Sequence, residues 1–76
     1  MTYLITEEML RERVAKKVRE LRKKRGLTVK RAAARGEIHW RHWQKVEAAH
    51  SNATMLTLVR IADALDIDPM ELVRAE

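Results

Sequence analysis

Apolar residues recur along the first third of the chain at the spacing of one helical face. They are Leu10, Val14, Val18 and Leu21. Their intervals of four, four and three positions predict an amphipathic α-helix. Thr6 is suited to cap its start, because a threonine oxygen can accept a free backbone N–H, and Gly26 is suited to end it. The chain therefore begins with one long helix.

Shorter helices are predicted after Gly26. The second, over about residues 29–35, contains three consecutive alanines, which allow another helix to approach closely. The third is expected over about residues 39–48. The fourth follows Thr54 as its cap, and its apolar residues are nearly all of the type found in a core. They are Leu56, Leu58, Val59, Ile61, Ala62 and Leu65.

A fifth helix is predicted to begin at Asp68-Pro69. Asp68 is a suitable cap there, and proline is well tolerated at the first helical position. Residues of high helix propensity dominate the whole chain, whereas phenylalanine is absent. The predicted fold class is therefore all-α, as one compact five-helix domain spanning residues 1–76.

Length and composition exclude several classes of protein. A chain of 76 residues has no room for a two-layer catalytic scaffold around a deep cleft. Without cysteine it has no disulfide and no thiolate metal site. Its longest uncharged run is too short to span a membrane, and its first nine residues carry no basic side chain of the kind a signal peptide needs. We expect a cytoplasmic protein with no membrane contact, no cofactor and no small-molecule ligand.

Charge is distributed unevenly along the chain. Residues 1–35 carry 12 basic and 4 acidic side chains, whereas residues 51–76 carry 2 basic and 5 acidic ones. The formal net charge is +5. A basic first half favours a polyanionic partner, although a solvated helix surface explains such a run about as well.

The third predicted helix has two chemically different faces when its residues are placed at about 100° intervals. One face is apolar with a single carboxylate, and consists of His39, Trp43, Val46 and Glu47. The opposite face consists of Trp40, Arg41, Gln44, Lys45 and Ala48. Arginine, lysine and glutamine are the side chains that read guanine and adenine edges in the major groove. An ordinary amphipathic helix with a solvated basic face is the alternative.

A spaced set of residues connects these helices to a known family. The set consists of Leu27-Thr28, Ala33, Trp43-Gln44-Lys45-Val46-Glu47, Asn52-Ala53-Thr54-Met55 and Thr57-Leu58-Val59-Arg60-Ile61-Ala62. In this spacing the chain resembles the helix-turn-helix domain of the lambdoid phage repressor and Cro family of bacterial regulators, over about residues 10–73. The resemblance implies a central helix-turn-helix at about residues 28–48, an N-terminal arm at 1–6 and binding of duplex DNA.

The resemblance also implies roles for individual residues. The family's base-contacting positions are held by Trp40, Arg41 and Lys45, with Gln44 beside them. Positions near its phosphate contacts are held by Thr28, Lys30, Arg31 and Asn52. An ion pair between the first and third helices is matched by Arg22 and Glu47.

The chain departs from the family at four positions. Glu37 stands where the family has a turn glycine, one residue after Gly36, and Ala49 replaces the glycine that follows the third helix. Val29 stands at a position where a glutamine often contacts phosphate. Trp43 replaces a branched aliphatic residue, and its place on the apolar face predicts a core position.

Other chemistry is weakly indicated. His39 and His42 lie three residues apart but complete no closed set of metal ligands. Ser51 has no local base partner for nucleophilic catalysis. Three aspartates lie close together in sequence, at Asp63, Asp66 and Asp68, but the glycine and the final glutamate of a calcium loop do not accompany them. We expect no metal site, no catalytic residue and no enzymatic activity.

The sequence therefore predicts a sequence-specific transcriptional regulator that binds double-stranded DNA. Within this class it predicts a repressor. One short recognition helix reads too few base pairs, so a homodimer on a near-palindromic operator is expected. Candidate interface residues are Tyr3, Leu4, Ile5, Met70, Leu72 and Val73, unless they only close the monomer core. The alternative is an antitoxin-type protein-interaction module on the same fold.

Overall fold

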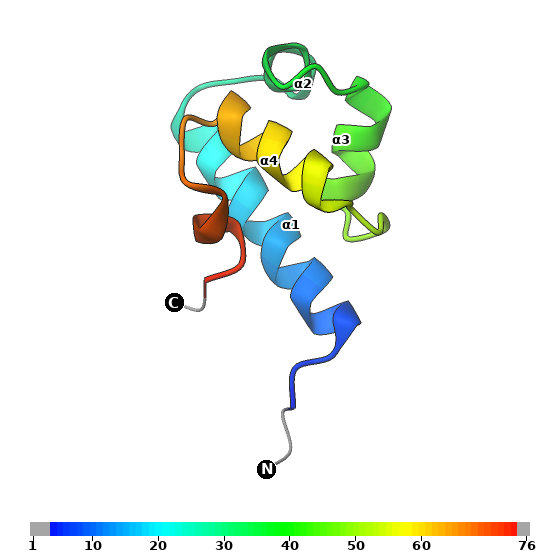
Figure 1. Ribbon diagram of the computed structural model, residues 1–76. Helices are drawn as coiled ribbons and strands as arrows, with labels where there is room; N and C mark the ends of the chain where they lie inside the picture. The colour runs from blue at the N-terminus through cyan, green and yellow to red at the C-terminus, as the bar shows by residue number, and fades with distance from the viewer. Residues whose placement is uncertain (1–3, 75–76) are drawn as a thin grey trace.

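The computed structural model describes residues 4–74, and within them it contains four α-helices and one short 3₁₀-helix (Figure 1). Their bounds are α1 Glu7–Lys24, α2 Val29–Arg35, α3 Trp40–Glu47, α4 Met55–Ala64 and η1 Pro69–Leu72. The described part contains no strand. The all-α prediction is confirmed, and the four α-helices begin and end close to the predicted positions.

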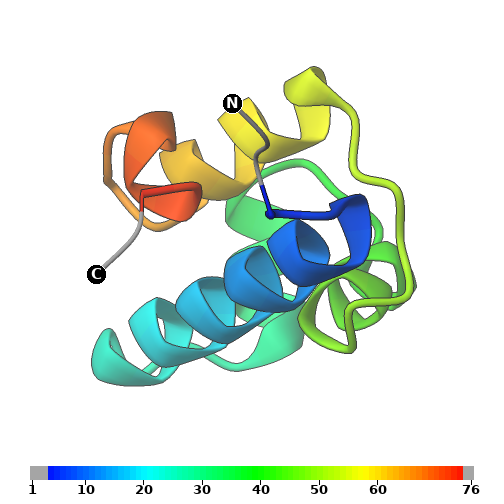
Figure 2. The same ribbon diagram turned by 90° about the horizontal axis from the view of Figure 1, so that it is seen from below.

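The helices form a single packed group. The long helix α1 contacts both α3 and η1, while α2 contacts α3 and α4. Figure 1 shows α4 crossing in front of α1, with α2 and α3 together at the far end of the molecule from the N-terminus. Seen from below in Figure 2, α1 lies across one side, and α4 and η1 lie across the other.

Short polar side chains fix the starts of these helices. Thr6, Thr28 and Thr54 each accept a backbone N–H from the third residue that follows, at 3.1 Å. Asp68 accepts the Met70 N–H at 2.8 Å. Each of these caps satisfies one of the backbone donors that a helix leaves unpaired in its first turn.

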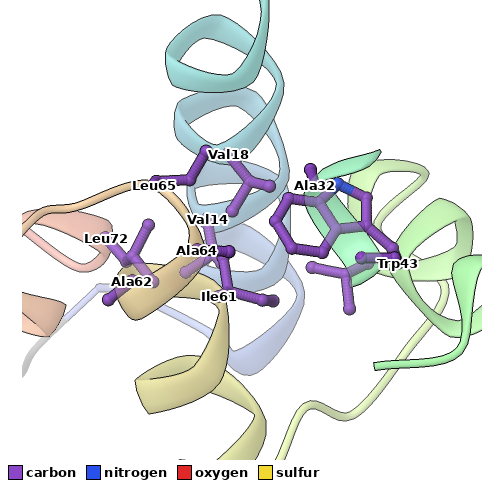
Figure 3. Close-up of a cluster of buried hydrophobic side chains, with 11 residues drawn as sticks. Val14, Val18, Ala32, Trp43, Ile61, Ala62, Ala64, Leu65 and Leu72 are labelled. Atoms are coloured by element: carbon purple, nitrogen blue, oxygen red, sulfur yellow. The ribbon is translucent and has the colours of Figure 1, made fainter. Parts of the chain in front are cut away.

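The core is small and draws on every helix. Its largest fully buried side chains are Trp43, Ile61, Leu65, Leu72 and Val18. Figure 3 shows the indole of Trp43 on one side of Val18 and Ile61, with Leu72 on the other. Ala32 and Ala33 are also buried there, so two of the three alanines of α2 face close neighbours as predicted, whereas Ala34 is exposed.

The predicted fifth helix is wrong in type, because η1 is a single 3₁₀ turn of four residues. Its bonds run over three residues, from Glu71 N to Asp68 O at 2.9 Å and from Val73 N to Met70 O at 3.2 Å. So short a segment fixes its backbone for very few hydrogen bonds, which makes a full α-helix unfavourable and a tighter turn common.

Two residues of α4 that were predicted as core type lie on the surface instead. Leu56 and Val59 are 59% and 50% exposed, whereas Ile61 and Leu65 are fully buried. The apolar residues of α4 extend around more of its circumference than α1, α2 and η1 cover. Burial therefore depends on which side of α4 meets the other helices.

All four α-helices end with a residue in the left-handed conformation. Their φ angles are +66° at Gly26, +56° at Glu37, +61° at Ala49 and +55° at Asp66. In each case the next amide bonds back five residues, as in Ile38 N to Ala33 O at 2.9 Å. This is the hydrogen bond of the Schellman motif, in which glycine carries the smallest penalty.

Gly36, by contrast, has a φ of −89°, so its backbone conformation does not require glycine. A Cβ at this position would lie 2.8 Å from the carbonyl oxygen of Arg60 and 3.3 Å from Cβ of Ala64. Glycine at this position permits the close approach of α2 to α4.

No helix in the described residues is long and apolar enough to cross a bilayer.

Candidate nucleic-acid interface

The two faces of α3 differ in burial as the helical spacing predicts, except that His39, which was placed on the inner face, is exposed because it precedes the helix as its N-cap. On the inner face, Trp43, Val46 and Glu47 are buried. On the outer face, Arg41, Gln44 and Lys45 are exposed and Trp40 is partly buried. Nδ1 of His39 caps the helix by accepting the Arg41 N–H at 3.1 Å. The helix therefore presents its amide, guanidinium and ammonium groups to solvent.

A hydrogen-bonded carboxylate holds the inner face of α3 against α1. Arg22 donates from Nε to Oε2 of Glu47 at 2.6 Å and from Nη2 to Oε1 at 3.0 Å. Trp43 donates from Nε1 to the same Oε2 at 2.5 Å. Both carboxylate oxygens are therefore satisfied, as a buried carboxylate requires.

The arginine of this pair bonds to a third segment as well. Its Nη1 donates to the carbonyl oxygen of Leu27 at 2.9 Å, in the link before α2. The hydrogen bonds that Arg22 donates to Glu47 raise the pKa of Arg22 above its ordinary value, because they favour the charged guanidinium. Arg19 adds a bond from Nη1 to the Glu47 carbonyl at 3.0 Å. The expected pair is thus part of a larger network that fixes α3 and the α1–α2 link.

The outer face of α3 forms an open, shallow surface. It is lined by Trp40, Arg41, Gln44, Lys45, Ala48 and His50. The structure thus brings together all four residues that were predicted to contact bases. None of the carboxylates in the described residues forms an ion pair with Arg41 or Lys45.

Cationic side chains from α2 and α3 meet at Trp40. Lys30 Nζ lies 5.1 Å from the centroid of the indole, and Arg41 Cζ lies 5.2 Å from it. The ring of His39 stacks on the same indole, with centroids 5.9 Å apart and planes inclined by 23°. Trp40 therefore contacts groups on both helices of the helix-turn-helix.

The predicted phosphate-contacting residues fall into two places. Thr28, Lys30 and Arg31 lie at the start of α2, where all three are exposed. The Thr28 oxygen accepts the Arg31 N–H, which leaves its hydroxyl proton available to a ligand. Asn52 lies in the α3–α4 loop and does not line the outer-face surface.

Arg11 was not identified from the sequence, although it holds the Asn52 side chain. Its Nη1 donates to Oδ1 of Asn52 at 2.7 Å, across 41 residues of sequence. This bond occupies the amide oxygen and leaves the NH₂ group of Asn52 as the free donor. No sequence signal marks such a pair, because it depends on where the loop packs against α1.

The histidines, aspartates and serine that were considered for metal binding or catalysis do not gather as a metal site in the described residues. Within residues 4–74, no three histidine, aspartate or glutamate side chains gather as metal ligands. His42 Nε2 lies 3.2 Å from Oγ of Ser51, which ties the α3–α4 loop to α3.

Comparisons with known proteins agree with this geometry. The helix-turn-helix family HTH_3 matches residues 18–72. The restriction-modification controller protein C.AhdI from Aeromonas hydrophila is 29% identical, with a TM-score of 0.79 over 82% of this chain and 94% of its own. An HTH_3 family transcriptional regulator from Vibrio cholerae is 27% identical, with a TM-score of 0.84 over 88% of this chain but only 38% of its own.

A third structure supports the fold alone. It is described as the hypothetical transcription factor NHTF from Neisseria, and is 22% identical, with a TM-score of 0.84 over 97% of this chain and 85% of its own. No curated protein matches the chain in sequence. The family match and the neighbours confirm the prediction of a helix-turn-helix protein of the transcriptional-regulator class.

Proposed function

Because the chain belongs to the HTH_3 helix-turn-helix family, we propose that it is a sequence-specific transcriptional regulator that binds double-stranded DNA, and specifically a repressor. The observation that carries this proposal is the outer face of α3. Its donors are exposed and have no carboxylate partner, while the opposite face is fixed to α1 through Glu47. Such a rigidly held row of donors suits the major groove, where purine edges offer acceptors.

In this proposal the helix-turn-helix at about residues 28–48 is the DNA-reading unit of a single domain over 1–76. Base edges are contacted by Trp40, Arg41, Gln44 and Lys45. Phosphates are contacted by Thr28, Lys30, Arg31 and Asn52. The first group would determine the preferred sequence, whereas the second would position the protein on any duplex. The protein would act in the cytoplasm as a DNA-binding regulator without enzymatic activity.

We also propose a homodimer on a near-palindromic operator whose half-sites lie roughly 34–36 Å apart. Exposed apolar residues of α4 support this part of the proposal. Met55 is 84% exposed, Val59 lies one turn after it, and Leu56 lies three residues before Val59. Met70 of η1, which packs against α4, is also exposed. Exposed apolar side chains that neighbour one another on a helix, as these three of α4 do, favour a protein contact.

The interface candidates from the sequence differ in burial. Leu72 is fully buried, so for this residue the alternative holds, namely that it only closes the monomer core. Leu4 and Ile5 are exposed and Val73 is partly buried, so they remain available for an interface. Tyr3 lies outside the described residues.

Selection of bound sequences from a random duplex library tests the proposal. We expect an enriched near-palindrome, bound at least about a thousandfold more tightly than random duplex at physiological salt. Sedimentation at micromolar concentration should give a dimer mass, and Val59→Glu should shift it toward the monomer. If no sequence is enriched and random duplex binds only weakly, the antitoxin-type protein-interaction module becomes the better account.

A further inference from the structure

Trp40 lies at the corner where α2 meets α3. It is the first residue of α3, and its partly buried side chain packs against the edge of the core. Lys30 reaches it from α2 and Arg41 from α3, both within 5.2 Å of the ring centroid. Within residues 4–74 neither Lys30 nor Arg41 forms a salt bridge, so the contact of their charged groups is with the indole of Trp40.

The contact has a physical consequence for binding. A cation within about 6 Å of an aromatic centroid is attracted by the quadrupole of the ring. Lysine and arginine lose rotamer freedom when a ligand immobilises them, and this loss weakens binding. An indole that restrains both side chains beforehand reduces that loss, so part of the ordering is complete before DNA arrives.

We propose that Trp40, in addition to its own proposed contact with a base edge, is a positioning residue that couples the phosphate contact of Lys30 to the base contact of Arg41. This inference rests on the proposed function and adds to it an interaction between the two classes of contact. Lys30 touches only phosphate in the proposed complex, but its loss frees the indole to shift and with it Arg41. Substitution of Lys30 therefore changes sequence preference as well as general affinity.

The first experiment compares Lys30 with a matched neighbour. Arg31 is an exposed cation on the same helix, whereas the described cation contacts of the ring come from Lys30 and Arg41. Both Lys30→Gln and Arg31→Gln should lower the salt slope of binding by about one unit, because each removes one phosphate contact. Only Lys30→Gln should also relax the sequence preference, by roughly threefold. This relaxation should occur at the same base pair as the one caused by Arg41→Ala. Equal effects of the two variants on preference would overturn the inference.

A double-mutant cycle tests the role of the ring itself. Trp40→Leu should weaken specific binding by about threefold to tenfold without changing the salt slope, since both cations remain. In the Lys30→Gln background the effect of Trp40→Leu should shrink at least about twofold, whereas in the Arg31→Gln background it should persist. Trp40→Phe, which keeps an aromatic face, should recover most of the affinity. Additive effects in both backgrounds would show that Trp40 acts only through a contact of its own, and would overturn the coupling.

A measurement on the free protein keeps the inference testable if Trp40→Leu fails to fold. In the wild-type protein, NMR should show the Lys30 Hε resonances shifted upfield by the indole ring current, with the Lys24 resonances at their ordinary position. Absence of that shift in the folded protein would overturn the inference alone. A wild-type protein that shows the shift but binds no duplex would overturn the proposed function and, with it, the coupling.

Discussion

The inner and outer faces of α3 both carry polar groups, but those groups have opposite surroundings. On the inner face, both oxygens of Glu47 accept hydrogen bonds, from Arg22 and from Trp43. On the outer face, Arg41, Gln44 and Lys45 are exposed and only Arg41 has a described side-chain contact, with the ring of Trp40. One helix thus holds one set of polar groups satisfied within the protein and another set that is open to a ligand.

This difference separates stability from recognition within eight residues. A buried carboxylate stabilises a fold only while its partners are present, because loss of one leaves an unpaired charge. Exposed donors contribute little to the free energy of unfolding, yet they can determine which ligand binds. Substitutions on the two faces should therefore change different measurements.

The largest effect is expected on the inner face. Glu47→Ala should lower the free energy of unfolding by about 3–5 kcal/mol, because it leaves Arg22 partly buried without its carboxylate. Thermal or urea denaturation of the free protein measures this loss. Glu71→Ala is the matched control, because it breaks the exposed Arg74–Glu71 pair, and its cost should stay below about 1 kcal/mol. Equal stability of the two variants would mean that the network around Glu47 is not stabilising.

The close contact that supports the helix-turn-helix should also be sensitive. Gly36→Ala places a Cβ 2.8 Å from the Arg60 carbonyl oxygen, so α2 must move away from α4. The expected cost is about 1–3 kcal/mol of unfolding free energy, as for other overpacked sites. Gly26→Ala is a useful comparison, because it meets nothing within 4 Å and is disfavoured only by its φ of +66°. A Gly36→Ala variant as stable as the wild type would contradict this packing.

On the outer face, substitutions should change binding and leave stability unaltered. Arg41→Ala and Lys45→Ala should each cost about 1–3 kcal/mol at one base pair of the selected site and relax preference there. The measurement is the ratio of specific to random-duplex affinity, with the melting temperature of each free variant as the control. If both variants keep the wild-type ratio, α3 does not read bases.

The smallest effect concerns Ala49, the second residue after the end of α3. Ala49 has a φ of +61°, which is unfavourable for any residue with a Cβ, so Ala49→Gly should stabilise the protein by up to about 1 kcal/mol. Denaturation midpoints measure the gain. Ala48→Gly, one residue earlier at a φ of −90°, should give no gain. A loss of stability in Ala49→Gly would show that the methyl group contributes more than the strain costs.

Much of the fold follows from local sequence, because its causes act within a few residues. The caps Thr6, Thr28 and Thr54 fix where three helices begin, since each oxygen meets an N–H three positions ahead. The two faces of α3 follow from its spacing, since side chains one turn apart lie on the same side.

The tertiary structure decided what depends on contacts between distant segments. It buried Leu72 and exposed Leu56, because the position of η1 and the orientation of α4 select among residues of equal hydrophobicity. It reduced the fifth helix to one 3₁₀ turn, and it joined Arg11 to Asn52 across 41 residues. It also placed Lys30 of α2 over Trp40 of α3. Such pairs have no local signal in the sequence, because they form only when packed helices bring separate parts of the chain within a few ångströms.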